Sequence, residues 1–504
     1  MDKILEVVGL DGKYQNILLR INLLTGILPV IYPLQIPFLT KQPNFFVIKN
    51  DEPNKTYEME YSPELCNSNI YNITKNPKKS IINWSYTYDL YCSKESYKTI
   101  ITSIIFLGGM IGTLIILPLP DKYGRKKILQ LSSLISLFLH LNLLFNINAI
   151  HLIIINFIGG IFGQISALGY ALFTEFFDKN KNGLLIGIYN AIFPFGGIFL
   201  TFFFIFPIHW RYLYIITVLI HCHYTYITYK YFIESPRWLH SVGDKNGCLN
   251  SLNEIAIYNQ REELWINFKN NNLDLINKLG TVYLEKDKNN NNSKSENVNK
   301  NYTIFQILKF KSQRNTFIKI TAIFLCCSYN YFGIILNLGK LKGNFYLNGI
   351  FAFLGELTTE LISGKLADKF GRVKILLISC IIGTLGYILY LISPSFKFIF
   401  IFIAMIGYSG LFNITSIYAP EIYPTKIRNI SISYSSFISR LSPICVPILT
   451  QIMPNLIDYS FIICGIFAGL IGLTLEETLG KKVIDIIPEE EEEKENLKVE
   501  LLSK

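Results

Sequence analysis

Twelve stretches of about 20 mostly apolar residues constrain the fold of this chain more than any other feature. Each is long enough to cross the hydrocarbon core of a bilayer as an α-helix. Only 17% of the 504 residues are charged, which is too few to cover the surface of a soluble protein of this length. The predicted spans are residues 17–39, 98–119, 128–147, 149–173, 183–206, 211–232, 315–337, 346–366, 373–392, 396–417, 430–452 and 458–475.

Basic residues in the short loops predict how these spans are oriented. With the N-terminus inside, the short cytoplasmic loops hold eleven Lys and Arg, and the opposing short loops hold four. Short cytoplasmic loops are enriched in basic residues, so both termini are expected in the cytoplasm. The first 16 residues carry charges and no cleavage site, which predicts that the first span is a retained signal-anchor. The net charge of +10 therefore marks the inner membrane face, and the chain needs no nucleic-acid partner.

We therefore expect an all-α membrane protein of twelve transmembrane helices in two pseudo-symmetric six-helix bundles. Its predicted segments are an N-terminal segment with helix 1 (1–39), an extracellular loop (40–97), helices 2 to 6 (98–232), a cytoplasmic loop (233–314), helices 7 to 12 (315–476) and an acidic cytoplasmic tail (477–504). The sequence predicts no β-strand.

The predicted extracellular loop carries signs of an oxidising compartment. Its sequons predict glycosylation at Asn54, Asn72 and Asn83. Cys66 and Cys92 form an even pair there, and we consider a disulfide between them and two free thiols equally open. The plasma membrane is the expected location, although sequons and a long loop also fit an internal membrane.

Two motifs recur in the two halves of the chain. Asp-Lys-aromatic-Gly-Arg begins at Asp121 and again at Asp368, 247 residues later. Glu175 follows the first copy by 54 residues, and Glu421 follows the second by 53. Such spacing indicates a duplication of six spans, which is the plan of transporters whose two bundles rock about a central binding site.

The repeated loops are predicted to form a cytoplasmic gate. Gly124 and Gly371 permit a tight turn between helices where a side chain would clash. Charged pairs beside such turns can hold one face closed and then break when the bundles move. The charged residues expected in this gate are Asp121, Arg125, Glu175, Asp368, Arg372, Glu421 and Arg428.

With both loops, the chain resembles the major facilitator superfamily, and several segments resemble its organic cation/anion/carnitine transporter branch. These segments are ILEVVGLDGKYQ at the start, ESPRWL at 234–239, NEIAIYNQ nearby, YFG at 331–333, YAPEIYPTKIRN at 418–429 and LEETLG at 475–480. The first half departs from the family pattern, because Asn156 and Asn182 stand where the resemblance implies arginines. The resemblance implies a transporter of small organic ions that works by alternating access.

Ionisable residues inside the spans are the best candidates for the substrate site, because a charge there is costly without a role. Arg440 resembles the position where anion transporters of the branch have Arg and cation transporters have Asp, which favours an anion. Glu356 and Glu360 lie four apart, on one helix face, and a pair with Arg440 would cancel that preference. Cations, zwitterions and neutral solutes therefore remain open. Aromatic side chains at Tyr329, Tyr331 and Phe332 are expected to line the same cavity.

Enzymes and metal proteins are not favoured. The sequence shows no metal, nucleotide or nucleophile motif, and His221 and His223 point to different faces of a helix. We expect no cofactor and no metal, so transport is driven by gradients, through facilitated diffusion, exchange or proton symport.

Two alternative functions remain. One is a sugar porter of the same fold, although this chain reads CCSYNYFG in helix 7, where sugar porters have a Gln-Gln pair. The other is a non-transporting receptor with a transporter fold, which the missing first-half arginines favour.

Overall fold

A computed structural model describes residues 2–116, 118–163, 175–177, 182–277, 279, 308–424 and 427–480. These residues divide into two compact units, and each unit is described by itself. Unit 1 comprises Met1–Gln35, Gly108–Gly196 and Ile208–Val298, and unit 2 comprises Ile36–Leu107, Gly197–Pro207 and Asn299–Lys504. The ends of some first-half helices therefore belong to the same unit as the second half.

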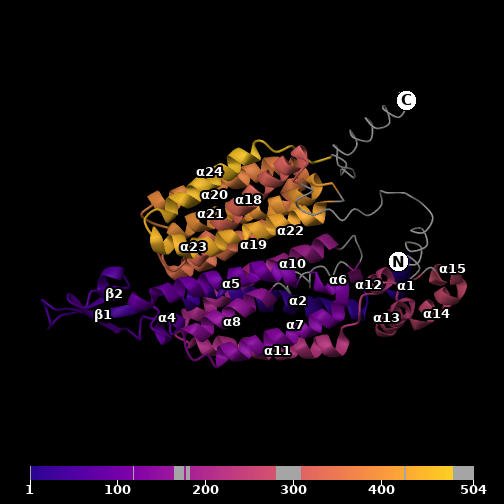
Figure 1. The fold of residues 1–504 in the computed structure, drawn as a ribbon, viewed down its shortest axis with the longest axis horizontal. Helices are drawn as coiled ribbons and strands as arrows, with labels where there is room; N and C mark the ends of the chain where they lie inside the picture. Colours follow the sequence, from indigo (N-terminus) through magenta and orange to yellow (C-terminus); the bar gives the residue numbers. More distant parts are fainter. Residues whose placement is uncertain are drawn as a thin grey trace. The chain divides into compact units, whose positions relative to one another are not determined.

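The described parts of the predicted first-half spans are mostly helical (Figure 1). Short helices α3 (Ile36–Leu39) and α6 (Leu119–Tyr123) follow the first two. The longer helices are α2 (Lys13–Leu34), α5 (Glu95–Ile115), α7 (Arg125–Leu144), α8 (Ala149–Phe162), α10 (Asn182–Ile205) and α11 (Trp210–Tyr231).

The second half forms a bundle in which helices α18 to α24 lie side by side (Figure 1). The span predicted at 430–452 is broken at Arg440. Pro443 explains the break, because its ring clashes with the carbonyl four residues earlier and it has no amide to donate. The helices are α18 (Lys311–Leu336), α19 (Phe345–Phe370), α20 (Arg372–Ile392), α21 (Lys397–Ile422), α22 (Arg428–Ser439), α23 (Leu441–Ile452) and α24 (Ile457–Gly472).

Among the described residues, six helical segments are long and apolar enough to cross a membrane. They are Cys92–Tyr123, Arg125–Leu144, Lys311–Leu336, Arg372–Ile392, Lys397–Ile422 and Ile430–Ile452. Shorter apolar helices cover Ala149–Phe162, Asn190–Ile205 and Ile457–Gly472. Large apolar side chains such as Phe138, Ile381 and Ile463 are exposed on these helices. Such faces suit a lipid environment better than water.

The prediction of an all-α chain without strands is wrong for the 40–97 loop. Strands β1 (Asn44–Lys49), β2 (Thr56–Glu60) and β3 (Tyr71–Lys75) form an antiparallel sheet in the order β2-β1-β3, and Figure 1 shows β1 and β2 beyond the short helix α4 (Trp84–Thr87). Phe45 pairs with Met59 on one side and Lys75 on the other. Phe45 and Val47 are buried at alternate positions, which is the period-two pattern of a strand. The sequence signal that was missed is the run of aromatic and β-branched residues from Phe45 to Ile48.

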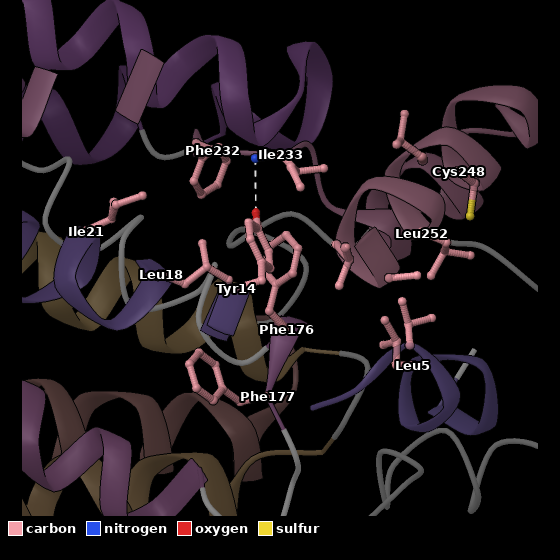
Figure 2. Close-up of a cluster of buried hydrophobic side chains, with 14 of the residues drawn as sticks. Leu5, Tyr14, Leu18, Ile21, Phe176, Phe177, Phe232, Ile233, Cys248 and Leu252 are labelled. Carbon is pink, nitrogen blue, oxygen red and sulfur yellow. Dashed lines mark hydrogen bonds between the residues drawn. The ribbon is translucent and has the colours of Figure 1, made fainter. Parts of the chain in front are cut away.

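The central loop also contains ordered helices, and they pack together with the N-terminal segment. These helices are α1 (Asp2–Val8), α12 (Pro236–Ser241), α13 (Lys245–Tyr258), α14 (Glu262–Asn271) and α15 (Leu273–Asn277). Figure 2 shows their shared core, where Leu5 lies beside Leu252 and the amide of Ile233 donates to the Tyr14 hydroxyl at 3.0 Å. Asn259 holds the N-terminal turn by donating to the carbonyls of Val8 and Gly9, both at 3.1 Å.

Candidate functional site

The two repeated Gly residues adopt the same unusual backbone conformation. Gly124 has φ 97° and ψ 149°, and Gly371 has φ 105° and ψ 149°. Residues with a side chain rarely adopt such positive φ values. A Cβ on Gly124 would lie 2.6 Å from Glu234 Oε2, and one on Gly371 would lie 2.5 Å from Glu477 Oε2. The sequence therefore needs Gly at both positions for two reasons, the turn and the close carboxylate.

In the second repeat, Arg372 lies at the centre of a network of carboxylates. Its guanidinium is 2.9 Å from Asp368 Oδ1 and 3.0 Å from Glu421 Oε1, and it also donates to the carbonyl of Ala367 at 3.2 Å. Thr478 donates to the other oxygen of Glu421 at 2.5 Å. Asp368 is exposed while Arg372 and Glu421 are largely buried, so the pair with Glu421 is the stronger part of the network.

The first repeat builds the same arrangement. Arg125 Nη2 lies 2.9 Å from Asp121 Oδ1 and 3.1 Å from Glu175 Oε1, and Nη1 donates to the carbonyl of Pro120 at 3.0 Å. The structure thus brings the predicted Asp, Arg and Glu together in each repeat. Arg428 makes a different contact from the one expected, because its Nε donates to the carbonyl of Tyr423 at 3.4 Å, whereas Glu421 pairs with Arg372.

Two further carboxylates complete these networks, and the sequence alone did not assign them. Glu234 accepts from the amides of Arg125 and Lys126 at the start of α7, at 3.0 and 3.1 Å. Glu477 accepts from the amides of Arg372 and Val373 at the start of α20, at 2.8 and 3.1 Å. A carboxylate at a helix N-terminus satisfies unpaired amides and complements the helix dipole. The sequence signal was that Glu234 in ESPRWL and Glu477 in LEETLG follow the corresponding helix of each half.

The environment of Glu477 stabilises its charged form. Burial alone would raise the pKa of this carboxyl, but hydrogen bonds from the backbone amides of Arg372, Leu479, Val373 and Thr478 outweigh it and lower the pKa. Glu477 is therefore an anion at neutral pH, which suits its position at the N-terminus of α20.

The predicted substrate residues of α18 and α19 are partly brought together. Tyr331 donates its hydroxyl to Glu356 Oε2 at 2.9 Å, and both side chains are buried. One helical turn later, Glu360 Oε2 accepts from the amide nitrogen of Asn413 in α21 at 2.9 Å. The same nitrogen donates to Ser363 Oγ at 3.1 Å. Each acid on α19 is thus held by a different neighbouring helix.

The other predicted substrate residues lie elsewhere in unit 2. Tyr329 shares a hydrogen bond of 2.7 Å with Ser460 of α24, away from the acids. The ring of Phe332 packs edge to face on Phe106, with centroids 5.0 Å apart. Arg440 stands half-buried at the break between α22 and α23.

Unit 2 contains a close contact between first-half and second-half residues that the sequence did not reveal. We call it the loop-end seal, because it adjoins the 40–97 loop. A Cβ on Gly197 would lie 2.4 Å from the ring of Phe353, and one on Gly349 would lie 3.1 Å from Thr201 Oγ1. Ser103 Oγ donates to the carbonyl of Ile444 at 3.0 Å. The seal comprises these contacts and the ring pairs Phe38–Phe345 and Phe106–Phe332. Gly lets the helices approach without a gap.

In the 40–97 loop, the structure joins Cys66 and Cys92 in a disulfide. Asn54 and Asn72 are exposed, but Asn83 is fully buried. Its amide nitrogen donates to the carbonyls of Phe38 and Lys41 at 2.7 and 2.8 Å. A glycan bonds to this nitrogen, so we expect Asn83, unlike the two exposed sequons, to remain unglycosylated. Asn83 instead caps α4 and holds the chain where it leaves the first span.

This difference makes a direct prediction about the three sequons. When the protein is expressed in a glycosylating cell, Asn54→Gln and Asn72→Gln are each expected to remove one glycan, seen as a step in electrophoretic mobility. Asn83→Gln is expected to leave the glycan number unchanged and to reduce surface expression, because the two carbonyls lose their donor. Loss of a glycan in Asn83→Gln would contradict the structure.

The histidines do not form a metal site in the part of the chain that the structure describes, where no group of three or more metal-ligating side chains occurs. The ring of His221 lies tilted against that of His140 of α7, with centroids 4.1 Å apart, and its Nε2 shares a hydrogen bond of 2.7 Å with Ser136. His221 is therefore part of the packing between α7 and α11.

Comparison with known proteins agrees with this geometry. The family model described as "Sugar (and other) transporter" matches residues 36–486. Organic cation/carnitine transporter 4 of Arabidopsis thaliana is 25% identical over 79% of this chain and 74% of its own length. The organic cation transporter-like protein of Drosophila melanogaster is 23% identical, over 97% of this chain and 92% of its own. Solute carrier family 22 member 15-like of Xenopus tropicalis is 25% identical, over 88% and 86%.

Solved structures share the fold. The inward-open conformation of the xylose transporter XylE from E. coli aligns with a TM-score of 0.59 and 15% identity, over 93% of this chain and 97% of that one. The crystal structure of a D-xylose-proton symporter aligns with a TM-score of 0.58 and 14% identity, over 94% and 99%. At this identity the likeness concerns the fold alone. The chain is therefore a multi-pass integral membrane protein of the sugar (and other) transporter family of the major facilitator superfamily, and it is similar to organic ion transporters of that superfamily.

Proposed function

We propose that this protein carries small organic ions across the plasma membrane by alternating access, using twelve membrane helices with both termini in the cytoplasm. The observation that carries the proposal is the duplicated Arg–carboxylate network. Arg125 with Glu175 and Arg372 with Glu421 have matching geometry in the two repeats. A network at equivalent positions of two repeats suits a gate that must close symmetrically.

In this proposal the gate has two layers. Asp121, Glu234, Asp368, Glu477 and the Arg–Glu pairs hold the cytoplasmic ends of the bundles, and Gly124 and Gly371 supply the turns. The loop-end seal closes the opposite end, where Gly197 and Gly349 permit the helices to touch. Both sets are formed in this structure, so opening either end of the transporter requires the set at that end to break.

The substrate site is proposed in unit 2, with Glu356 and Glu360 as the central groups and Tyr331 beside Glu356. Tyr329, Phe332 and Arg440 lie elsewhere in unit 2 and are proposed as further contacts for the solute. Two carboxylates attract positive charge, and the relatives are named for organic cations and carnitine. Arg440 adds a cation that suits a carboxylate on the substrate. We therefore rank a positively charged or zwitterionic substrate ahead of the purely anionic one that Arg440 alone favoured.

Two observations bear on proton coupling and on the alternative of a non-transporting receptor. Glu356 is a buried acid that accepts a hydrogen bond from the Tyr331 hydroxyl, which suits a group that gains and loses a coupling proton. Glu175 keeps Arg125 as an ion-pair partner even though Asn182 replaces the expected Arg. The intact pair favours a working transporter over a non-transporting receptor.

An uptake panel tests this proposal. Cells expressing the protein at the surface are given labelled tetraethylammonium, carnitine, para-aminohippurate and xylose, which represent a cation, a zwitterion, an anion and a sugar. We expect uptake of the first or second above that of untransfected cells, and a fall of about tenfold or more in Glu356→Gln, because a buried charged contact is lost. Uptake of xylose alone would favour the sugar porter. No uptake of any probe despite surface expression would refute the proposal.

A further inference from the structure

Asn413 links helix α21 to the second acid of α19. Its amide nitrogen lies 2.9 Å from Glu360 Oε2 and 3.1 Å from Ser363 Oγ. An Asn amide nitrogen has two N–H donors, so both bonds form at once. The side chain is half-buried, and Glu360 is half-buried beside it.

The two helices are packed closely enough to fix this contact. A Cβ on Gly355 of α19 would lie 2.6 Å from the carbonyl of Phe402 in α21. Thr359, next to Glu360, donates to the carbonyl of Ile406 in α21 at 3.1 Å. Since the backbones are in contact on the same stretch, Asn413 cannot follow Glu360 if that side chain turns away. The bond therefore restricts the carboxylate to one direction.

The first acid of α19 is held differently. Glu356 takes its hydrogen bond from Tyr331 of α18 and is buried, whereas Glu360 takes its bond from α21 and is partly accessible. The two acids lie one turn apart on α19, but their hydrogen-bond partners come from different helices, and they differ in exposure to solvent. Of the two acids, the carboxylate of Glu360 is therefore the more exposed, and Asn413 holds it in one direction.

We propose that Asn413 is a positioning residue that fixes the carboxylate of Glu360 for the positively charged group of the transported solute. This inference rests on the proposed function, because it assigns a role within the same substrate site. Fixing a flexible Glu in advance lowers the cost of binding, since the side chain no longer loses its rotamer freedom when the solute arrives. The role therefore acts on affinity more than on the rate of the conformational cycle.

The test is a double-mutant cycle on uptake of labelled tetraethylammonium or carnitine, whichever the wild type carries. Asn413→Leu is expected to raise KM about tenfold, as one charge-assisted hydrogen bond predicts, with the maximal rate within about twofold. In a Glu360→Gln background the same substitution is expected to add less than about twofold, because the carboxylate it positions is gone. Asn413→Gln keeps an amide donor and is expected to recover most of the affinity.

Ser416→Ala is the matched control, because Ser416 lies on the same helix, is exposed, and donates to the carbonyl of Phe412 in its own helix. Its KM is expected to equal that of the wild type. Equal effects of Asn413→Leu with and without Glu360, or a fall in maximal rate at unchanged KM, would overturn the inference while the proposed function stands. Absence of wild-type uptake of both probes would overturn both.

Discussion

Replacing Gly197 by leucine is expected to abolish most transport while the protein still reaches the cell surface. The Cβ of any residue here would lie 2.4 Å from the ring of Phe353, which is fully buried in α19. Contacts this short do not occur in well-packed proteins, so the loop-end seal cannot form. A carrier that cannot close one end cannot open the other, and uptake is expected to fall more than about tenfold. Uptake per surface protein, counted by biotinylation, measures the effect.

Two variants separate the seal from general damage. Gly197→Ala combined with Phe353→Ala removes the ring that the new Cβ meets, and we expect it to recover uptake relative to Gly197→Ala alone. Gly364→Ala lies on α19 at a position where a Cβ meets no atom within 4 Å, and it is expected to behave as the wild type. Normal uptake in Gly197→Leu would mean that the contact has no role in transport.

The second large effect is expected at Arg372. Arg372→Gln leaves Glu421 without its ion-pair partner in a partly buried position, where a stranded charge costs about 1–3 kcal/mol. We expect uptake to fall more than about tenfold and the purified protein to melt at a lower temperature. Adding Glu421→Gln to this variant removes the stranded charge and is expected to recover the melting temperature without recovering uptake.

The neighbouring charges supply controls for this prediction. Asp368→Asn removes an acid whose side chain is 72% exposed, so a much smaller loss of stability is expected. Lys374→Gln removes a basic residue on the exposed side of the same helix turn and is expected to change nothing. Equal damage in all three variants would show that net charge, and not the Arg372–Glu421 pair, is what matters.

The features that depend on local rules could be predicted from the sequence. The helices lie within a few residues of their predicted positions because a membrane span must satisfy its own backbone hydrogen bonds. The clustering of Arg125 and Arg372 with acids could be predicted because a repeated motif at equal spacing constrains two places at once. Their partners Glu175 and Glu421 were found from the same spacing.

The features that the sequence did not predict depend on contacts between distant residues. Asn83 lies in a sequon, but its burial depends on carbonyls about 40 residues earlier in the chain. Glu234 and Glu477 lie 109 and 105 residues from the amides they accept from. The partner of Glu360 is Asn413, 53 residues away on another helix. The pattern of residues within a single segment cannot predict such contacts between distant residues.

The most direct test of the central claim is counterflow in vesicles that contain only the purified protein. Vesicles are loaded with unlabelled carnitine or tetraethylammonium and diluted into a trace of the same labelled compound. A carrier that alternates access exchanges the two, so we predict a transient accumulation of label above the external concentration, absent in protein-free vesicles and in Gly197→Leu. Simple equilibration without a transient, or no entry of either compound, would contradict the account.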